Sequence, residues 1–142
     1  MIVPALGGSG DPTLHGATLV VYDSAGSGEK VVVSLPASGW KLLGSSTAPK
    51  GFKFTGTDPS GPISRVYVKA DQLKLRGGKA NWAYTLNEPS QGRIAVRLQL
   101  GSATPWCTDA PAKPSDSGKN DHVDKFTAQP KTPAPVVCPP AP

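Results

Sequence analysis

The chain is 142 residues long, which suits one domain or one domain with a tail, and its formal net charge is +5. Its 16 glycines and 16 prolines far exceed average use, and no window holds a helical apolar period beyond a turn or two. The composition excludes a mainly helical fold and a transmembrane helix, and it predicts short strands joined by tight turns.

The N-terminal part is expected to contain a leader and three strand-like segments. Residues 1–11 are rich in glycine and predict a flexible leader. Ala17–Tyr22 and Glu29–Leu35 are rich in β-branched residues and predict strands. Trp40–Leu43 is either a short strand or the start of a crossover, and Trp40 is expected in the core.

Turn-forming residues separate the strand-like segments in the middle of the chain. Gly51–Gly56 reads GFKFTG, in which two phenylalanines flank a lysine, as in a half-buried strand. Ile63–Lys69 and the segment 73–75 predict a hairpin around a turn at residues 70–72. A further strand is expected over Lys79–Leu86.

The clearest strand is predicted over Arg93–Leu100, where apolar and polar residues alternate strictly. Such alternation requires one buried face and one wet face, as in an antiparallel sheet. We expect the even-numbered side chains to lie in the core, namely Ile94, Val96, Leu98 and Leu100. The opposite face, which should lie in water, carries Arg93, Ala95, Arg97 and Gln99.

The pattern as a whole predicts an all-β fold. About seven strands at these intervals fit an antiparallel β-sandwich, immunoglobulin-like or related, or an open barrel. The expected organisation is a leader over 1–11, a β-sandwich core over 12–101 and an extended proline-rich arm over 102–142. Within the arm, only Val123–Thr127 is expected to pair.

The two cysteines, Cys107 and Cys138, lie in proline-rich segments with no hydrophobic strand to bury them. Neither belongs to a CxxC or CxxCH motif, so a zinc ribbon, a redox motif and c-type haem are unsupported. We expect a disulfide that ties the arm back, in a protein that is secreted, at the cell surface or in the periplasm. Two free thiols in a cytosolic protein are the alternative. Met1–Leu6 is too short for a signal peptide, so an export signal is expected to have been removed.

Several motifs resemble an uncharacterised β domain of bacterial secreted proteins. They are DPTLHGATLVVYD, LPASGWKLLG, the GFKF strand, LNEPSQGRIAVRLQLG before Cys107, and the ending KFTAQPKTPAPVVCP. The resemblance covers nearly all of residues 11–139 and implies export and β architecture, but no function. Members of that family often carry an extra cysteine pair in the central strands, and Ile63 stands where one of them would be expected.

Catalytic and metal-binding patterns are missing from the sequence. Only His15 and His122 could serve a hydrolytic triad, and both lie in expected loops without a nucleophile elbow. The acidic residues lie in turns and in the arm, where turn-forming roles explain them. The donor-rich segment Asp116–Asp124 does not follow EF-hand spacing, and a solvated loop or an adventitious calcium site would explain it. We expect no enzyme, no cofactor and no metal.

Two features are candidates for binding. Trp82 and Tyr84 share one face of an expected strand, where they form either an aromatic platform or part of the core. Between Arg65 and Arg97 the chain has seven basic and two acidic residues, whereas the remainder has eight of each sign. This segment is either a solvated sheet face or a surface for an anionic partner. Its candidate residues are Arg65, Lys69, Lys74, Arg76, Arg93 and Arg97, with Lys79 between them.

These observations favour a non-catalytic extracellular β-sandwich module for binding, attachment or display. The expected partner is a protein or a cell-surface component, such as acidic polysaccharide or lipid headgroups. Nucleic acid is not expected, because no stacking motif accompanies the charge. The alternative is a structural subunit of an extracellular filament or multi-protein assembly, including homo-assembly, and a carbohydrate-binding module ranks below both.

Overall fold

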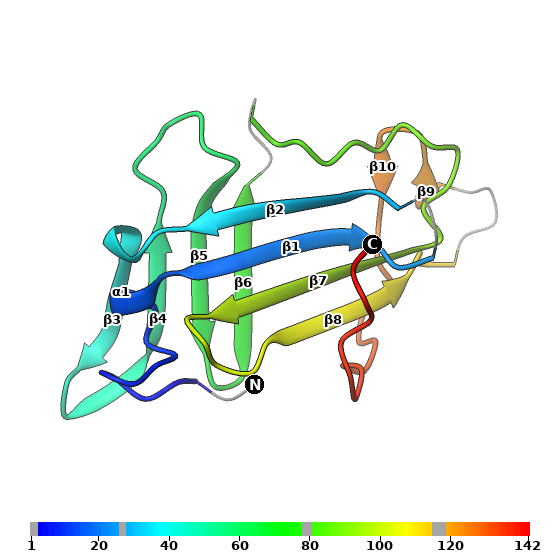
Figure 1. Ribbon diagram of the computed structural model, residues 1–142. Coiled ribbons are helices and arrows are strands. Elements are labelled where there is room, and N and C mark those ends of the chain that lie inside the picture. The colour runs from blue at the N-terminus through cyan, green and yellow to red at the C-terminus, as the bar shows by residue number, and fades with distance from the viewer. Residues whose placement is uncertain (1–2, 26–27, 78–80, 115–118) are drawn as a thin grey trace. The chain divides into compact units, whose positions relative to one another are not determined.

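The computed structural model describes residues 3–25, 28–77, 81–114 and 119–142. It is mostly strand with almost no helix, and its two four-stranded antiparallel sheets form a sandwich-like arrangement (Figure 1). The all-β expectation is therefore confirmed. One sheet has the order β2-β1-β7-β8 and the other β3-β4-β5-β6. This order keeps β3 to β6 consecutive, so the connections are not those of an immunoglobulin domain.

The two sheets are built from eight strands, and short elements complete the described structure. The first sheet is made of β1 (Ala17–Asp23), β2 (Lys30–Leu35), β7 (Arg93–Leu100) and β8 (Trp106–Pro111). The second sheet is made of β3 (Trp40–Ser45), β4 (Ala48–Thr55), β5 (Ile63–Lys69) and β6 (Gln72–Gly77). The short elements are α1 (Pro12–His15), the 3-10 turn η1 (Ala37–Gly39), and the paired β9 (Asp121–His122) and β10 (Lys125–Phe126).

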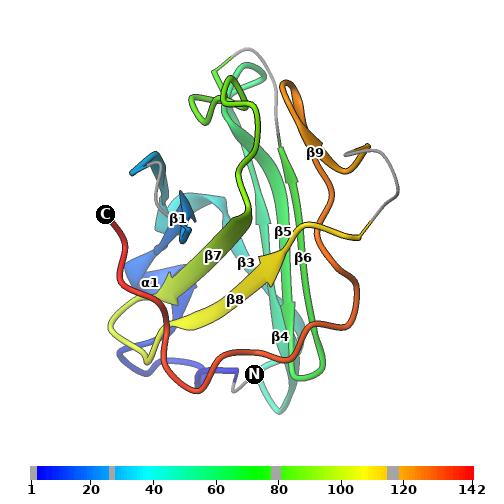
Figure 2. The ribbon, with the colours of Figure 1, turned by 90° about the vertical axis from the view of Figure 1, so that its right-hand side faces the viewer.

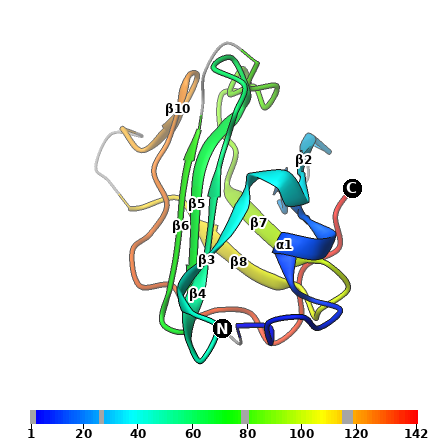
Figure 3. The same cartoon turned by 90° about the vertical axis from the view of Figure 1, so that its left-hand side faces the viewer.

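The chain divides into two compact units, each made of several segments of the sequence. The first unit comprises Met1–Leu19, Val33–Ala83 and Leu98–Pro105. The second unit comprises Val20–Val32, Tyr84–Arg97 and Trp106–Pro142. The second sheet lies entirely within the first unit, and Figures 2 and 3 show it from its two edges.

The first unit contains most of the hydrophobic core. Alternate residues of β3 to β5 point to one side and are buried: Trp40, Phe52, Phe54, Val66 and Val68. The ends of β1, β2 and β7 contribute Leu19, Leu35, Leu98 and Leu100. The Trp40 and Phe54 ring centroids are 5.5 Å apart, and the Trp40 indole N–H donates to the Leu35 carbonyl at 3.1 Å. The expected core position of Trp40 is confirmed.

The described part of the expected leader, residues 3–11, makes several hydrogen bonds. Asp11 is only 1% exposed, and its carboxylate accepts hydrogen bonds from the Gly7 N–H and from the N–H and hydroxyl of Thr13. The Ser102 N–H also donates to the Ser9 carbonyl at 3.0 Å. Burial acts to raise the pKa of Asp11, but these hydrogen bonds outweigh it and the pKa is lowered. The leader is thus held by a capped helix start.

The prediction of which β7 side chains are buried and which are exposed is only partly confirmed. Leu98 and Leu100 are buried as expected, but Ile94 and Val96 are half-buried, and Ala95 is completely buried instead of exposed. Arg93, Arg97 and Gln99 are half-buried rather than in water. In the second unit a C-terminal segment runs across β7 (Figures 1 and 2). Residues on both faces of β7 are at least half-buried.

That segment, Cys138–Pro142, is hereafter the strap, and three contacts fix it to three strands of the first sheet. Cys138 forms a disulfide with Cys107 of β8, which confirms the expected pairing. The Tyr22 hydroxyl of β1 donates to the Pro139 carbonyl, and the Lys30 ammonium of β2 donates to the Pro142 carbonyl. Because the sheet order is β2-β1-β7-β8, the strap crosses from one edge strand to the other.

Two expectations about secondary structure are wrong. The described part of Lys79–Leu86, residues 81–86, forms no strand, and residues 79–80 lie outside the described residues. The Thr85 N–H and hydroxyl both donate to the Glu29 carboxylate, and the Leu86 carbonyl accepts from the Asp124 N–H. These backbone groups therefore have partners outside any ladder. Conversely, the arm begins with a full strand, β8, in the first sheet.

Candidate anion-binding face

The outer side of the second sheet collects positive charge. Its four strands contain seven basic residues and no aspartate or glutamate. Successive side chains of a strand point to opposite sides, so the residues that alternate with the buried core project outward. We call these outward residues the basic face; they are Lys41, Lys53, Arg65, Tyr67, Lys69, Lys74 and Arg76.

Strand register places these residues in rows across the sheet. The first row runs Lys41, Lys53, Tyr67, Lys74 over β3 to β6, each residue directly opposite the next. The second row runs Thr55, Arg65, Arg76 over β4 to β6. Neighbouring strands are about 4.8 Å apart and successive outward residues about 7 Å apart, so the cations form a dense lattice.

Two of the cross-strand pairs oppose like charges: Lys41 with Lys53, and Arg65 with Arg76. Directly opposed like charges destabilise a sheet, by up to about 1 kcal/mol for each pair. Among the described residues, none of the six cations on this face forms an ion pair; the salt bridge present joins Arg93 and Asp109. In the described part of the chain, therefore, no ion pair offsets this repulsion.

A β-bulge fixes the position of Arg65. The register moves from Ile63 opposite Gly77 to Arg65 opposite Arg76, so Ser64 is an extra residue on β5. The Ser64 carbonyl accepts the Gly56 N–H at 2.9 Å, and its hydroxyl donates to the Arg76 carbonyl at 3.2 Å. Bulges commonly re-aim a neighbouring side chain, and this one brings the two guanidinium groups onto the same side of the hairpin.

A hollow of about 260 Å³ lies within the basic face and is lined by Arg65, Tyr67, Lys74 and Arg76. Tyr67 is half-buried, whereas the three cations around it are exposed. The Lys53 ammonium lies 5.5 Å from the centroid of the Tyr67 ring, a cation–π distance. The hollow therefore combines an aromatic surface with a cationic rim.

The structure brings four of the six predicted cations together: Arg65, Lys69, Lys74 and Arg76. Arg93 and Arg97 belong to β7 in the other unit and are half-buried. Arg93 pairs with Asp109 at 3.1 Å, and Asp109 also accepts from the Ser24 hydroxyl at 2.5 Å. Arg93 is thus part of the internal structure of the second unit, and Lys79 lies outside the described residues.

Sequence reasoning missed Lys41, Lys53 and Tyr67. It counted charge along a contiguous segment from Arg65, so lysines on the two preceding strands were not considered. The alternation of Lys53 between Phe52 and Phe54 was a usable signal for an outward side chain. Only strand register, however, shows that Lys41 and Lys53 lie in the same row as Tyr67.

Trp82 and Tyr84 do not form an exposed pair of rings. Tyr84 is buried, and its hydroxyl donates to the Gln91 side-chain carbonyl at 3.0 Å. Burial, followed by the negative charges of Asp23, Glu29 and Glu88, raises the pKa of Tyr84 far above its ordinary value. Trp82 is half-buried and belongs to the other compact unit. Tyr84 is therefore a core residue. Of the two alternatives predicted for this pair, its position agrees with the core and not with an exposed aromatic platform.

Asp121 organises the EPSQG turn. One of its carboxylate oxygens accepts from the Gln91 N–H at 2.7 Å, and the other accepts from the Gly92 N–H and the Ser90 hydroxyl, both at 2.8 Å. Burial acts to raise the pKa of Asp121, but these hydrogen bonds outweigh it and the pKa is lowered. In the donor-rich segment, Asp121 thus has a structural role, while residues 116–118 lie outside the described part.

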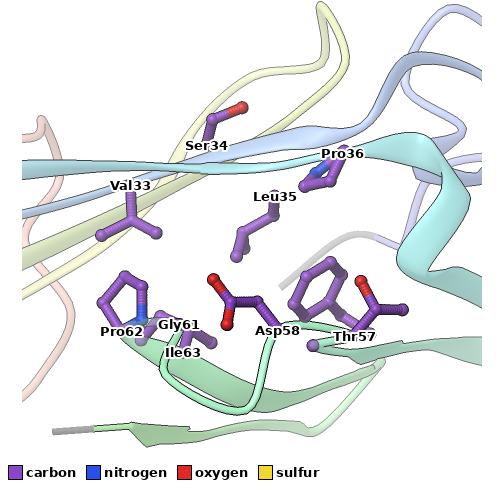
Figure 4. A pocket seen from close by; sticks show the side chains of 11 residues that line it. Val33, Ser34, Leu35, Pro36, Thr57, Asp58, Gly61, Pro62 and Ile63 are labelled. Carbon is purple, nitrogen blue, oxygen red and sulfur yellow. The ribbon is translucent and has the colours of Figure 1, made fainter. Parts of the chain in front are cut away.

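A second hollow, of about 210 Å³, lies beside β2 in the first unit (Figure 4). Its walls are largely apolar and include Val33, Leu35, Phe54 and Ile63. Asp58 is the acidic residue of its lining, and it accepts from the N–H and hydroxyl of Ser60 within its own turn. This hollow therefore lacks the pair of acids, or the acid and base, that hydrolysis requires.

No family model, curated protein or solved structure matches the chain. In the described part of the chain, no group of three or more histidine, cysteine, aspartate or glutamate side chains could hold a metal ion. Among the same residues, no helix is long and apolar enough to cross a membrane. The basic face is the feature of this fold with a chemical character suited to binding.

Proposed function

We propose that the protein is a secreted, non-catalytic binding module that attaches to an anionic polymer through its basic face. The observation that carries the proposal is the pair of cross-strand rows in which like charges stand directly opposite one another and, within the described residues, form no ion pair. An anionic ligand would supply the missing counter-charges and relieve the repulsion on binding.

A merely solvated sheet face explains the arrangement less well. Lysines that prevent edge-to-edge pairing belong on edge strands. Lys53, Arg65 and Lys69 lie instead on β4 and β5, the two central strands of the sheet. A solvated face also usually mixes both signs of charge, whereas these four strands hold basic residues alone.

Secretion is supported by the disulfide, because disulfides persist in oxidising compartments and are rare in the cytosol. The absence of catalysis is supported by the scatter of the titratable residues. His15 lies in α1 and His122 in β9. Asp58 accepts hydrogen bonds within its own turn, and Asp121 accepts them from the EPSQG turn.

The proposal is tested by retention on immobilised dextran sulfate at rising salt concentration. Retention of the wild-type protein should weaken as the salt concentration rises from about 0.05 M to 0.5 M, because the Debye length shrinks severalfold. The double variant Lys53→Gln/Lys74→Gln should elute at clearly lower salt than wild type. A matched control, Lys113→Gln/Lys125→Gln, removes the same charge from exposed positions of the second unit and should change elution little.

Equal losses in the two double variants would contradict the proposal, because retention would then depend on net charge alone. Unfolding of each variant should be followed in parallel. Removing one partner of the opposed pair Lys41 and Lys53 should leave stability unchanged or raise it slightly.

A second candidate function is that of a subunit in an assembly, and β2 favours it. This strand lies at the edge of its sheet, with Val32 57% exposed and the apolar hollow of Figure 4 beside it. Such an edge can accept a strand from another chain. Sedimentation at micromolar concentration should then show oligomers that Val32→Lys dissociates, and a monomeric wild type would contradict this candidate.

A further inference from the structure

We infer that the hollow around Tyr67 binds one carboxylated sugar ring, so that the anionic polymer is a polysaccharide containing uronic acid. The inference rests on the proposed function, because it assigns a ligand class to a place on the same basic face. It depends on three features: two opposed guanidinium groups, an aromatic ring between cations, and the dimensions of the hollow.

Arg65 and Arg76 provide recognition of a planar anion. They stand directly opposite one another across β5 and β6, and both line the hollow. A guanidinium presents N–H donors in a rigid planar fork that matches the two oxygens of a carboxylate, whereas an ammonium acts as a point charge. Neither arginine has an ion-pair partner among the described residues, so both forks remain available to a ligand.

Tyr67 provides a flat apolar surface at the same place. It is half-buried, in the middle of the row between Lys53 and Lys74. The face of an aromatic ring carries partial negative charge and attracts the weakly positive C–H groups on the face of a sugar ring. In a uronic acid the carboxylate is bonded directly to a ring carbon. A ring stacked on Tyr67 would therefore hold its carboxylate close to the neighbouring guanidinium groups.

The dimensions suit one sugar ring with the chain continuing across the sheet. The volume of about 260 Å³ lies just below the range of about 300–1,000 Å³ of pockets for drug-sized ligands. The other cations, Lys41, Lys53 and Lys69, lie outside the lining of the hollow. They are placed to contact the charges of adjacent sugar residues.

A membrane surface fits this face less well. Proteins that attach to anionic lipid usually combine basic residues with exposed apolar side chains that enter the bilayer. The large apolar residues that are exposed in the described chain all lie outside β3 to β6; they are Leu6, Leu14, Val32, Val123, Val136 and Val137. The basic face thus offers charge and an aromatic ring, without an apolar anchor.

The test compares polygalacturonate with its fully methyl-esterified form and with dextran sulfate, by calorimetry at low salt. Wild type should bind polygalacturonate and should not bind the neutral ester. Arg65→Lys/Arg76→Lys keeps the charge but removes both forks, and should weaken polygalacturonate binding by about tenfold or more. The same variant should bind dextran sulfate almost as well as wild type.

Tyr67→Ala and Tyr67→Phe test the stacking surface. The phenylalanine variant keeps the ring and should bind polygalacturonate like wild type, whereas the alanine variant should bind about tenfold more weakly or worse. A melting experiment on each variant separates loss of the ring from loss of the fold. If Tyr67→Ala fails to fold, the double lysine variant still decides the question, because it changes exposed side chains only.

Equal affinity of wild type and the double lysine variant for polygalacturonate would overturn the inference while leaving the proposed function intact. The same holds if dextran sulfate binds and polygalacturonate does not, since sulfate would then be the recognised group. Failure of every anionic polymer would overturn both. Binding confined to phosphatidylglycerol vesicles, or to single-stranded DNA, would replace the polysaccharide with a lipid or a nucleic acid.

Discussion

At the scale of single residues, two aspartates hold the loops of this protein by accepting hydrogen bonds from backbone N–H groups. Asp11 caps α1 and binds the turn before it, and Asp121 binds the EPSQG turn. An ionised carboxylate accepts such bonds more strongly than a neutral one, which explains why both pKa values are lowered. Each carboxylate therefore couples the stability of the fold to pH.

Asp121→Asn should lower the free energy of unfolding at pH 7 by about 1–3 kcal/mol, because an amide replaces a charged acceptor of three hydrogen bonds. The folded-state pKa lies below the ordinary value of 3.8. The stabilisation is therefore present above that value and is lost as pH falls through the folded-state pKa. The difference in unfolding free energy between variant and wild type should thus shrink in urea melts as the pH is lowered below 3.8.

Asp124→Asn is the matched control for this measurement. Asp124 is exposed, its φ is +67°, and asparagine tolerates this left-handed conformation. The control should stay within about 0.5 kcal/mol of wild type at pH 7. A similar loss in both variants, or a loss at Asp121 that does not depend on pH, would show that the carboxylate is not the stabilising group.

At the scale of elements, the strap ties three strands of the first sheet together. It is attached to β8 by the disulfide and to β1 and β2 by hydrogen bonds, so it spans the sheet order β2-β1-β7-β8. The disulfide closes a loop with a sequence separation of 31 residues. Its removal should lower the free energy of unfolding by about 3–4 kcal/mol in the chain-entropy model.

The measurement is a urea melt of Cys107→Ser/Cys138→Ser beside Tyr22→Phe, which removes only the hydrogen bond from Tyr22 to Pro139. The tyrosine variant should lose about 0.5–1.5 kcal/mol, the usual net contribution of one hydrogen bond. The account of the strap fails if the double serine variant loses no more than the tyrosine variant.

Sequence patterns predicted elements well where apolar and polar residues alternate over a half-buried strand. The β5–β6 hairpin and the whole of β7 were predicted in this way. The strand β8 was missed because WCTDAP carries little apolar alternation and ends in proline. Residues 81–86 show the opposite error, since alternation there reflects side chains that are buried without strand pairing, such as Tyr84.

At the scale of the whole molecule, the fold presents one sheet whose outer side holds basic residues without acidic ones. The clustering of charge between Arg65 and Arg97 indicated that positive charge was unevenly distributed. It could not show which strands share a side, because pairing across turns is set by register and by the bulge at Ser64. Four of the predicted cations therefore lie on the basic face together with one lysine from β3 and one from β4. Arg93 and Arg97 belong to the other sheet.

The central claim is that the basic face itself contacts the anionic polymer, and lysine acetylation read by mass spectrometry tests it without any mutation. Wild-type protein is acetylated alone and in the presence of saturating polymer, either polygalacturonate or dextran sulfate. We expect strong protection of Lys41, Lys53, Lys69 and Lys74, and little change at Lys113, Lys125 and Lys131, which are exposed in the second unit. Protection spread evenly over both sets, or confined to the second unit, would contradict the claim.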